Sequence, residues 1–293
     1  MRTLRGPVAD GTVHGLPGRI LASGCRGDAG WVPVWGTSRP CYSSAVLPPT
    51  SLFSLSRDEL ARLLTGWGEP AYRVGQVRRW MYRRLAPDFA AMTDLPSALR
   101  SRLDASTRLW TSATTHVERS PDDCTEKLLL RLRDGRHIES VLMRYLDAAD
   151  EDEGVRPEAA SGSASGIGRF TACISTQVGC AMGCVFCATG RLGLVRDLDG
   201  GECVEQVAHC AVRARSAGGR LGNVVIVGMG EPLANLPATL HLIGILIDPD
   251  GFGISPRRVT VSTVGLVPGI LRLASLGRPV RLAVSLHAAD DAL

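Results

Sequence analysis

The feature that most constrains the fold is an alternation of short apolar strands with amphipathic helices in the second half of the chain. The pattern predicts four strands: Phe170–Thr176, Val224–Val227, Arg258–Ser262 and Val280–Leu286. It predicts three intervening helices: about Glu202–Ala217, Ala238–Ile247 and Val267–Leu276. Strands and helices that alternate in this way form a parallel sheet with right-handed crossovers. We therefore expect an α/β fold. Four strands are too few to close a barrel, and the chain ends soon after the fourth, so we expect a C-terminally incomplete β/α barrel.

The rest of the chain divides into segments of different composition. Residues 1–50 are rich in Gly and Pro and lack periodicity, which predicts a poorly ordered extension. Residues 51–146 predict a small helical domain followed by a β-hairpin. Residues 147–168 are acidic and rich in Ser and Gly, which predicts a linker. Residues 169–293 then form the barrel.

The helical domain begins at a recognisable N-terminal signal. In SRDEL, Ser56 can cap a helix while Glu59 reaches back to it. Two further helices are predicted at Tyr72–Leu85 and Ser97–Thr107. The hairpin is predicted from two alternating strands and an Asp-Gly turn: Lys127–Leu132, His137–Tyr145 and Asp134-Gly135.

The helix predicted at Tyr72–Leu85 carries several arginines interleaved with aromatic residues and no acid. These residues are Arg73, Arg78, Arg79, Arg83 and Arg84 with Tyr72, Trp80 and Tyr82. Such a face suits RNA, because guanidinium groups track phosphates and aromatic rings stack on bases. The alternative is an ordinary solvated face with the aromatic side chains buried behind it.

Composition limits the compartment and the kind of site. No apolar run reaches the ~18–20 residues of a membrane helix, and the N-terminus lacks the hydrophobic stretch of a secretory signal. We therefore expect a soluble, cytoplasmic protein without a membrane partner. Nine cysteines, an odd number in such a chain, favour metal or redox chemistry over a disulfide framework. The net charge of +4 only weakly favours an anionic partner.

Three of the cysteines lie close together after the first predicted barrel strand. In CISTQVGCAMGCVFCATG, Cys180, Cys184 and Cys187 form a C-x₃-C-x₂-C pattern. Three thiolates in a glycine-containing loop can hold an iron–sulfur cube and leave one iron free for a substrate. One alternative is a zinc knuckle completed by Cys173 or a distant histidine. The other is a coincidence of core cysteines.

With three further motifs the chain resembles the radical S-adenosylmethionine (SAM) superfamily. More narrowly, it resembles the bacterial adenine C2-methyltransferases that modify 23S ribosomal RNA and tRNA. The motifs are, in chain order, QVGCAMGCVFCATG, VVIVGMGEPLANL, RRVTVSTVGLVPGI and LAVSLHAADD. The resemblance runs from about Leu52 to Leu293. It implies a [4Fe–4S] cluster on the three cysteines and SAM as the second cofactor.

The resemblance also assigns SAM binding to residues at the ends of the later strands. These are Gly230, Glu231, Ser262, Ser285, Leu286 and His287. The glycine lets the backbone approach a ligand, and the carboxylate of Glu231 offers a partner for an ammonium group. Taken singly, each polar residue also fits a strand end satisfied by neighbouring backbone.

Two more residues match catalytic positions of the family. Glu139 corresponds to the proposed proton acceptor, and Cys173 to a cysteine that forms a disulfide during turnover. From the sequence pattern alone, Glu139 is an exposed strand residue and Cys173 a buried small residue.

The reaction implied by the resemblance is radical methylation of adenine C2 in 23S rRNA, and in tRNA as a further substrate. An electron from a flavodoxin-like or ferredoxin-like donor cleaves SAM to a 5′-deoxyadenosyl radical, which acts on a methylated cysteine near the C-terminus. No cysteine follows Cys210, so we expect a fragment or a defective product. We also expect a monomer. The alternatives are another radical SAM enzyme and an inactive RNA-binding remnant.

Overall fold

The computed structural model describes residues 50–145, 168–288 and 290. All of them belong to one compact unit, Pro48–Leu293. The predicted extension up to residue 49 and the predicted linker up to residue 167 lie outside the described residues. None of the helices within the described ranges is long and apolar enough to cross a membrane.

The secondary structure alternates between helices and strands along the chain. The strands are β1 (Thr50–Ser51), β2 (Thr107–Arg108), β3 (Ala113–Arg119), β4 (Thr125–Arg131), β5 (His137–Tyr145), β6 (Arg169–Ile174), β7 (Gln177–Gly179), β8 (Leu194–Asp197), β9 (Arg220–Ile226), β10 (Val259–Thr263) and β11 (Arg281–Val284). The α-helices are α1 (Arg57–Gly66), α2 (Tyr72–Arg78), α3 (Ser97–Ser106), α4 (Ala188–Arg191), α5 (Gly200–Ser216), α6 (Leu236–Ile247) and α7 (Val267–Ala274). Short 3-10 helices are η1 (Leu52–Ser54) and η3 (Pro256–Arg258), and the π-helix is η2 (Arg79–Arg84).

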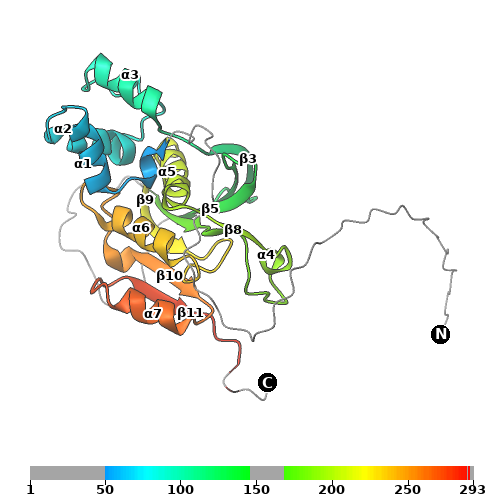
Figure 1. Ribbon diagram of the computed structural model, residues 1–293. Helices are drawn as coiled ribbons and strands as arrows, with labels where there is room; N and C mark the ends of the chain where they lie inside the picture. Colours follow the sequence, from blue (N-terminus) through cyan, green and yellow to red (C-terminus); the bar gives the residue numbers. More distant parts are fainter. Residues whose placement is uncertain (1–49, 146–167, 289, 291–293) are drawn as a thin grey trace, which may run out of the picture. The chain divides into compact units, whose positions relative to one another are not determined.

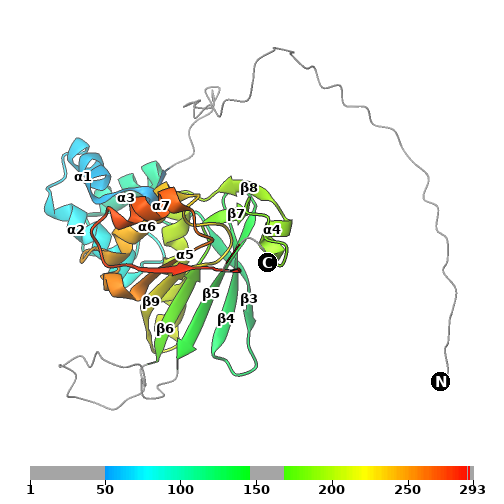
Figure 2. The same ribbon diagram turned by 90° about the horizontal axis from the view of Figure 1, so that it is seen from below.

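A seven-stranded sheet organises the fold, in the order β11-β10-β9-β6-β5-β4-β3. Strands β6, β9, β10 and β11 are parallel, which confirms the alternation predicted from the sequence. Helices α5, α6 and α7 lie along one face of this sheet (Figures 1 and 2). The mixed α/β architecture confirms the predicted fold class.

The two faces of the parallel strands differ in burial. Val224, Ile226, Val259 and Val261 are fully buried against the helices. The residues between them on β9 and β10 are half-buried. Because successive strand residues point to opposite faces, the second face of the sheet is the more open one, and Ser262 lies on it.

The β-hairpin continues the sheet of the parallel strands. Strands β4 and β5 pair antiparallel as predicted, and β5 then pairs antiparallel with β6, with Val141 opposite Cys173. The sequence analysis grouped this hairpin with the N-terminal helices, because the acidic segment separates it from the barrel. Pairing between β5 and β6 crosses that segment, and no local sequence signal marks such a pairing.

Two helices begin at capping boxes. In α1, the Ser56 hydroxyl accepts the Glu59 N–H, while the Glu59 carboxylate accepts the Ser56 N–H, which confirms the predicted start. In α5, Asp199 and Glu202 make the same reciprocal pair, which the sequence analysis did not identify. The third predicted helix is also confirmed, as α3.

The arginine- and aromatic-rich helix forms as α2 and η2, but much of it is buried. Arg78 is only 1% exposed and forms an ion pair with Asp248 at 2.6 Å. Trp80 and Tyr82 are buried, and the guanidinium of Arg84 lies over the Trp80 ring at 4.2 Å. The alternative of aromatics buried behind the arginine face is therefore confirmed for these two rings. Arg78 holds the helix against the barrel and is not free to contact phosphate.

Candidate cluster and cofactor site

The three cysteines of the motif lie on a loop that a short antiparallel ribbon, β7 with β8, closes at its base. The Cys180 N–H donates to the Gly193 carbonyl at 3.0 Å, and the Cys187 N–H donates to the Cys184 carbonyl at 3.0 Å. Gly179 has a φ of +78°, and a Cβ there would lie 1.8 Å from the Gly193 oxygen. Only glycine fits this position, so Gly179 sets the approach of the two ribbon strands.

The thiols of these cysteines are unbonded and lie within electrostatic reach of one another. Burial raises the pKa of the Cys180 thiol, and a contact from the Met182 N–H at 3.5 Å opposes this rise. The charges of Cys184, Cys187 and Glu231 raise the same pKa further. The loop therefore carries three thiols, and the backbone of Glu231 is joined to the base of the loop by its hydrogen bond to the Gln177 side chain.

The donor set fits a cubane cluster better than a single metal ion. Among the described residues, no group of three or more His, Cys, Asp or Glu side chains is placed to hold one metal ion. A zinc site needs about four ligands that converge on one ion, whereas the loop supplies three thiols. In a four-iron cube each thiolate binds its own iron, so the thiols need not converge on one point.

The glycine-rich turn after β9 docks against the segment between β6 and β7. The N–H groups of Thr176 and Gln177 donate to the Met229 carbonyl at 2.8 and 3.1 Å. Gly230 has a φ of +101°, and a Cβ there would lie 2.6 Å from the Cβ of Gln177. Glycine is therefore required at 230 by both conformation and space.

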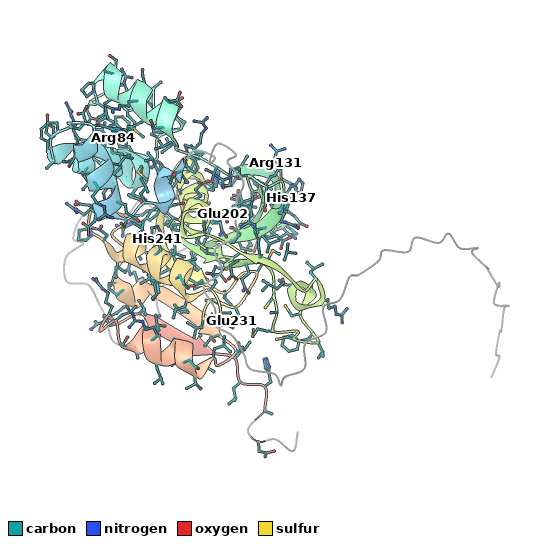
Figure 3. All side chains as sticks on the ribbon, viewed as in Figure 1. Arg84, Arg131, His137, Glu202, Glu231 and His241 are labelled. Atoms are coloured by element: carbon teal, nitrogen blue, oxygen red, sulfur yellow. The ribbon has the colours of Figure 1, made fainter. Side chains whose placement is uncertain are left out.

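Glu231 is buried and fixed by backbone groups from two elements (its position is marked in Figure 3). Its carboxylate accepts the N–H groups of Leu233 and Val264, both at 3.0 Å. Its own N–H donates to the Gln177 side chain at 2.8 Å. A carboxylate can accept about four hydrogen bonds, so Glu231 keeps acceptor capacity for a ligand ammonium group.

The residues predicted at the ends of β10 and β11 lie at the same end of the sheet. Ser262 is opposite Ala283 in the strand register, and the Ser285 N–H donates to the Thr263 carbonyl at 2.9 Å. Leu286 is exposed, and the His287 ring lies 5.0 Å from the ring of Phe186. Since Phe186 belongs to the cysteine loop, the fold brings His287 to the candidate cluster site.

Glu139 and Cys173 share the open face of the sheet. Cys173 lies opposite Val141, two residues from Glu139, and the Ser175 hydroxyl donates to the Glu139 carbonyl at 2.6 Å. The Glu139 carboxylate is exposed and lies 3.6 Å from the Lys127 ammonium. Burial raises the pKa of the Cys173 thiol to about 11. The Glu139 side chain is exposed, as the sequence pattern alone predicts.

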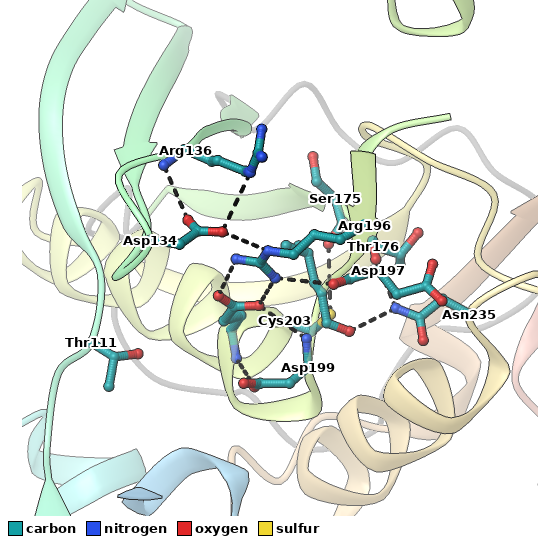
Figure 4. A network of polar contacts seen from close by, with 12 residues as sticks. Thr111, Asp134, Arg136, Ser175, Thr176, Arg196, Asp197, Asp199, Cys203 and Asn235 are labelled. Carbon is teal, nitrogen blue, oxygen red and sulfur yellow. Dashed lines mark hydrogen bonds and ion pairs between the residues drawn. The ribbon is translucent and has the colours of Figure 1, made fainter. Parts of the chain in front are cut away.

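A buried polar network lies beneath the site and is not predicted from the sequence; Figure 4 labels its members Ser175, Thr176 and Asn235. Gln206 of α5 accepts hydrogen bonds from the Ser140 hydroxyl and the Ser175 N–H, at 2.9 and 2.8 Å. Asn235 donates to the carbonyls of Thr176 and Leu198, both at 2.8 Å. The available signal was a polar run, Ser175 to Gln177, directly after an apolar strand.

Two protein-family models match the chain. Residues 50–109 match the model described as "Ribosomal RNA large subunit methyltransferase N-terminal domain". Residues 174–293 match the model described as "Radical SAM superfamily". The second match spans the cysteine loop, Glu231 and the ends of β10 and β11.

A probable dual-specificity RNA methyltransferase RlmN of Roseiflexus castenholzii is 42% identical over 292 residues, covering 88% of this chain and 67% of the relative. The chain belongs to the RlmN family. The Myxococcus xanthus protein named dual-specificity RNA methyltransferase RlmN 1 is 47% identical, covering 83% of this chain and 62% of that relative. A crystal structure of a radical SAM methyltransferase from Sphaerobacter thermophilus has 45% identity and a TM-score of 0.73.

The chain covers 65% of that crystallised protein and 62–67% of the two relatives. RlmN-family membership confirms the predicted resemblance. With the radical SAM domain, it also implies the predicted cofactors, a [4Fe–4S] cluster and SAM.

Proposed function

We propose that this RlmN-family protein uses SAM to methylate adenine C2 in 23S rRNA, and in tRNA as a second substrate. The observation that carries the proposal is that buried Glu231 is hydrogen-bonded at 2.8 Å to the Gln177 side chain, on the strand that leads directly into Cys180. An anchored carboxylate next to a three-cysteine loop suits a ligand that bears an ammonium group and also binds the cluster. The name "dual-specificity" of the relatives supports two RNA substrates.

In this proposal each residue has a limited task. Cys180, Cys184 and Cys187 hold the cluster, and Glu231 with Gly230 orients the ammonium end of SAM. Ser262, Ser285, Leu286 and His287 contact the remainder of SAM from the strand ends. When bound, the cluster supplies the electron that makes SAM a radical source, which adenine C2 requires because it is a poor nucleophile.

Glu139 and Cys173 act after the methyl carbon has been added to the base. Glu139 takes the proton from the methylated carbon, and its carboxylate lies 3.6 Å from the Lys127 ammonium. Cys173 supplies the sulfur that forms the disulfide during turnover. Its buried thiol holds its proton at neutral pH, since its pKa is raised to about 11.

The target adenosine must leave its base stack to reach this site, as enzymes that modify bases require. The open face of the sheet, which carries Glu139 and Cys173, receives it. The N-terminal helices, which match the methyltransferase N-terminal model, hold the surrounding RNA.

The decisive test uses the protein expressed from its complete gene. This protein is reconstituted anaerobically with iron and sulfide. It is incubated with methyl-labelled SAM, a reductant and either a 23S rRNA fragment or tRNA. We expect label on RNA, and mass spectrometry of the digested nucleosides to place it at C2 of adenosine. Methyl label at another base or another carbon would contradict the proposed function. So would a protein that carries its iron–sulfur cluster and never labels RNA.

A Glu139→Gln variant separates binding from proton transfer. It should bind SAM and RNA as the parent does, because it keeps the shape of the side chain, but release little methylated RNA. RNA shifted by a protein that takes up no iron would instead favour the alternative of an inactive RNA-binding remnant.

A further inference from the structure

A cavity of about 470 Å³ opens at the end of the sheet opposite the candidate cofactor site. Its wall includes the first residues of β9 and the residue before β10, whereas the cofactor site follows the other ends of these strands. The seven residues of β9 are separated by steps of about 3.3 Å from one residue to the next, which places about 20 Å between the first and the last. The cavity is therefore separate from the cysteine loop.

Four arginines from different elements line this cavity, and its lining contains no acidic residue. They are Arg83, Arg215, Arg220 and Arg258. Within the described ranges, no carboxylate forms an ion pair with any of them. The cavity thus concentrates positive charge that no acidic side chain within the described residues neutralises, and such a surface attracts anions.

Two of the guanidinium groups are held in place by backbone carbonyls. Arg83 donates to the carbonyls of Phe252 and Pro249 at 3.0 and 2.8 Å. Arg215 donates to the Arg84 carbonyl at 2.8 Å. Carbonyl partners fix a guanidinium without cancelling its charge, so these groups are preorganised for an anion.

The other two arginines keep their side-chain donors available. No hydrogen bond joins the Arg220 or Arg258 side chain to another described residue, and both residues line the cavity. An arginine fork matches the oxygens of a phosphate in a bidentate manner. Arg220 and Arg258 are therefore the groups that would contact a ligand directly.

Tyr82 lines the cavity without offering an aromatic face to a base. Tyr82 is buried, and its ring contacts the rings of Phe53 and Phe252 at 5.8 and 5.3 Å. The Arg78 guanidinium lies 5.1 Å from the same ring. With its ring surrounded in this way, Tyr82 has no free face on which a nucleobase could stack.

We propose that this cavity binds the phosphodiester backbone of the RNA at a second contact, about 20 Å from the cofactor site. The inference rests on the proposed function, because it assumes that RNA is the substrate. A contact of this kind fixes the position of a large RNA without specifying its sequence. It extends the RNA-binding surface from the N-terminal helices onto the amino ends of the barrel strands.

The test is the salt dependence of RNA binding by the cluster-loaded, full-length protein. Each phosphate contact contributes about 0.7–0.9 to the slope of log K against log salt. The variant Arg220→Gln with Arg258→Gln should lower the slope by about 1.4–1.8 and weaken binding to different RNAs equally. The pair Arg220→Lys with Arg258→Lys, which keeps the charge, should retain most of the slope.

The matched control is Arg272→Gln with Arg278→Gln, which removes the same charge from exposed arginines on and after α7. The parent slope should persist in this control. A parent that binds RNA while the cavity variant keeps the parent slope would overturn this inference and leave the proposed function intact. A parent that binds no RNA would overturn both.

A small phosphate-bearing ligand is the competing occupant. Titration of the parent with AMP and with inorganic pyrophosphate identifies it. AMP could bind the parent tightly and lose this binding in the Arg220→Gln, Arg258→Gln variant, while the salt slope of RNA binding is the same in both proteins. In that case the cavity binds a free nucleotide and the inference is wrong. If the cavity variant is poorly folded, protection of parent arginines from phenylglyoxal by RNA is measured instead. Absence of protection at Arg220 and Arg258 then contradicts the proposal.

Discussion

The guanidinium of Arg196 forms a bidentate ion pair with the carboxylate of Glu202, at 2.7 and 2.8 Å (Figure 4). Arg196 also donates to the carboxylate of Asp134 at 2.7 Å. Arg196 lies on β8, Glu202 belongs to the capping box of α5, and Asp134 lies in the hairpin turn between β4 and β5. The Arg196 side chain therefore links the ribbon of β7 and β8 to the start of a helix and to the hairpin. This arrangement identifies Arg196 as a residue that positions the cysteine loop.

Replacing Arg196 should loosen this loop. We expect Arg196→Ala to lower the free energy of unfolding by about 1–3 kcal/mol, because Glu202 is left nearly buried without its partner. Iron uptake should fall as well, since β8 anchors the ribbon. Arg136→Ala is the control: Arg136 is half-exposed, and within the described part of the chain its one ion pair is with Asp134, so the change should be under about 0.5 kcal/mol. Equal losses in both variants, measured by thermal unfolding, would refute the positioning role.

Two glycine substitutions should have opposite effects. Gly230→Ala forces a side chain into a φ of +101° and against Gln177, which should cost about 1–3 kcal/mol and weaken SAM binding. Gly244→Ala lies in α6 with nothing within 4 Å of the added Cβ, so it should stabilise by about 0.5–1 kcal/mol. Chemical denaturation and SAM titration check both. A tolerated Gly230→Ala would argue against a close approach of this turn to its neighbours.

Each cysteine of the loop should be needed for iron. The parent should take up about four iron atoms per chain, and Cys180→Ser, Cys184→Ser or Cys187→Ser should take up almost none. Cys124→Ser, in the segment before β4, is the control and should keep the parent iron content. Iron and acid-labile sulfide analysis provides the measurement. Full iron content in any of the three loop variants would remove that cysteine from the ligand set.

His209 should make stability depend on pH. Burial lowers the pKa of His209 from 6.5 to about 4. Between pH 4 and pH 6.5, the imidazole of His209 is therefore protonated in the unfolded chain and neutral in the folded chain. The contribution of His209 to the free energy of unfolding is therefore fully present above pH 6.5. It decreases as pH falls towards 4, by up to about 1.4 kcal/mol per pH unit.

The comparison with His209→Gln isolates this effect. The neighbouring Glu205 has a raised pKa, mainly because of burial, so its ionisation weakens the fold as pH rises and partly offsets the histidine in the parent. The difference in unfolding free energy between parent and variant should therefore change across pH 6.5 to 4 and be constant above it. A difference that is constant over the whole range would show that His209 is not desolvated in solution.

Local sequence signals determined much of the chain. The Ser56 capping box, the Asp134-Gly135 hairpin and the strand–helix alternation depend on residues near one another in sequence, and their elements form as expected. The cysteine spacing likewise identified the candidate cluster loop, because three ligands on one short loop need no distant partner.

Only the tertiary structure decided which distant groups meet. It joined the hairpin to the barrel sheet through β5 and β6, buried Arg78 against Asp248, and placed Arg196 between Glu202 and Asp134. It also gathered arginines from four separate segments around one cavity. Pairing across long stretches of chain is set by the total burial and charge balance of the folded molecule, which no local window of sequence contains.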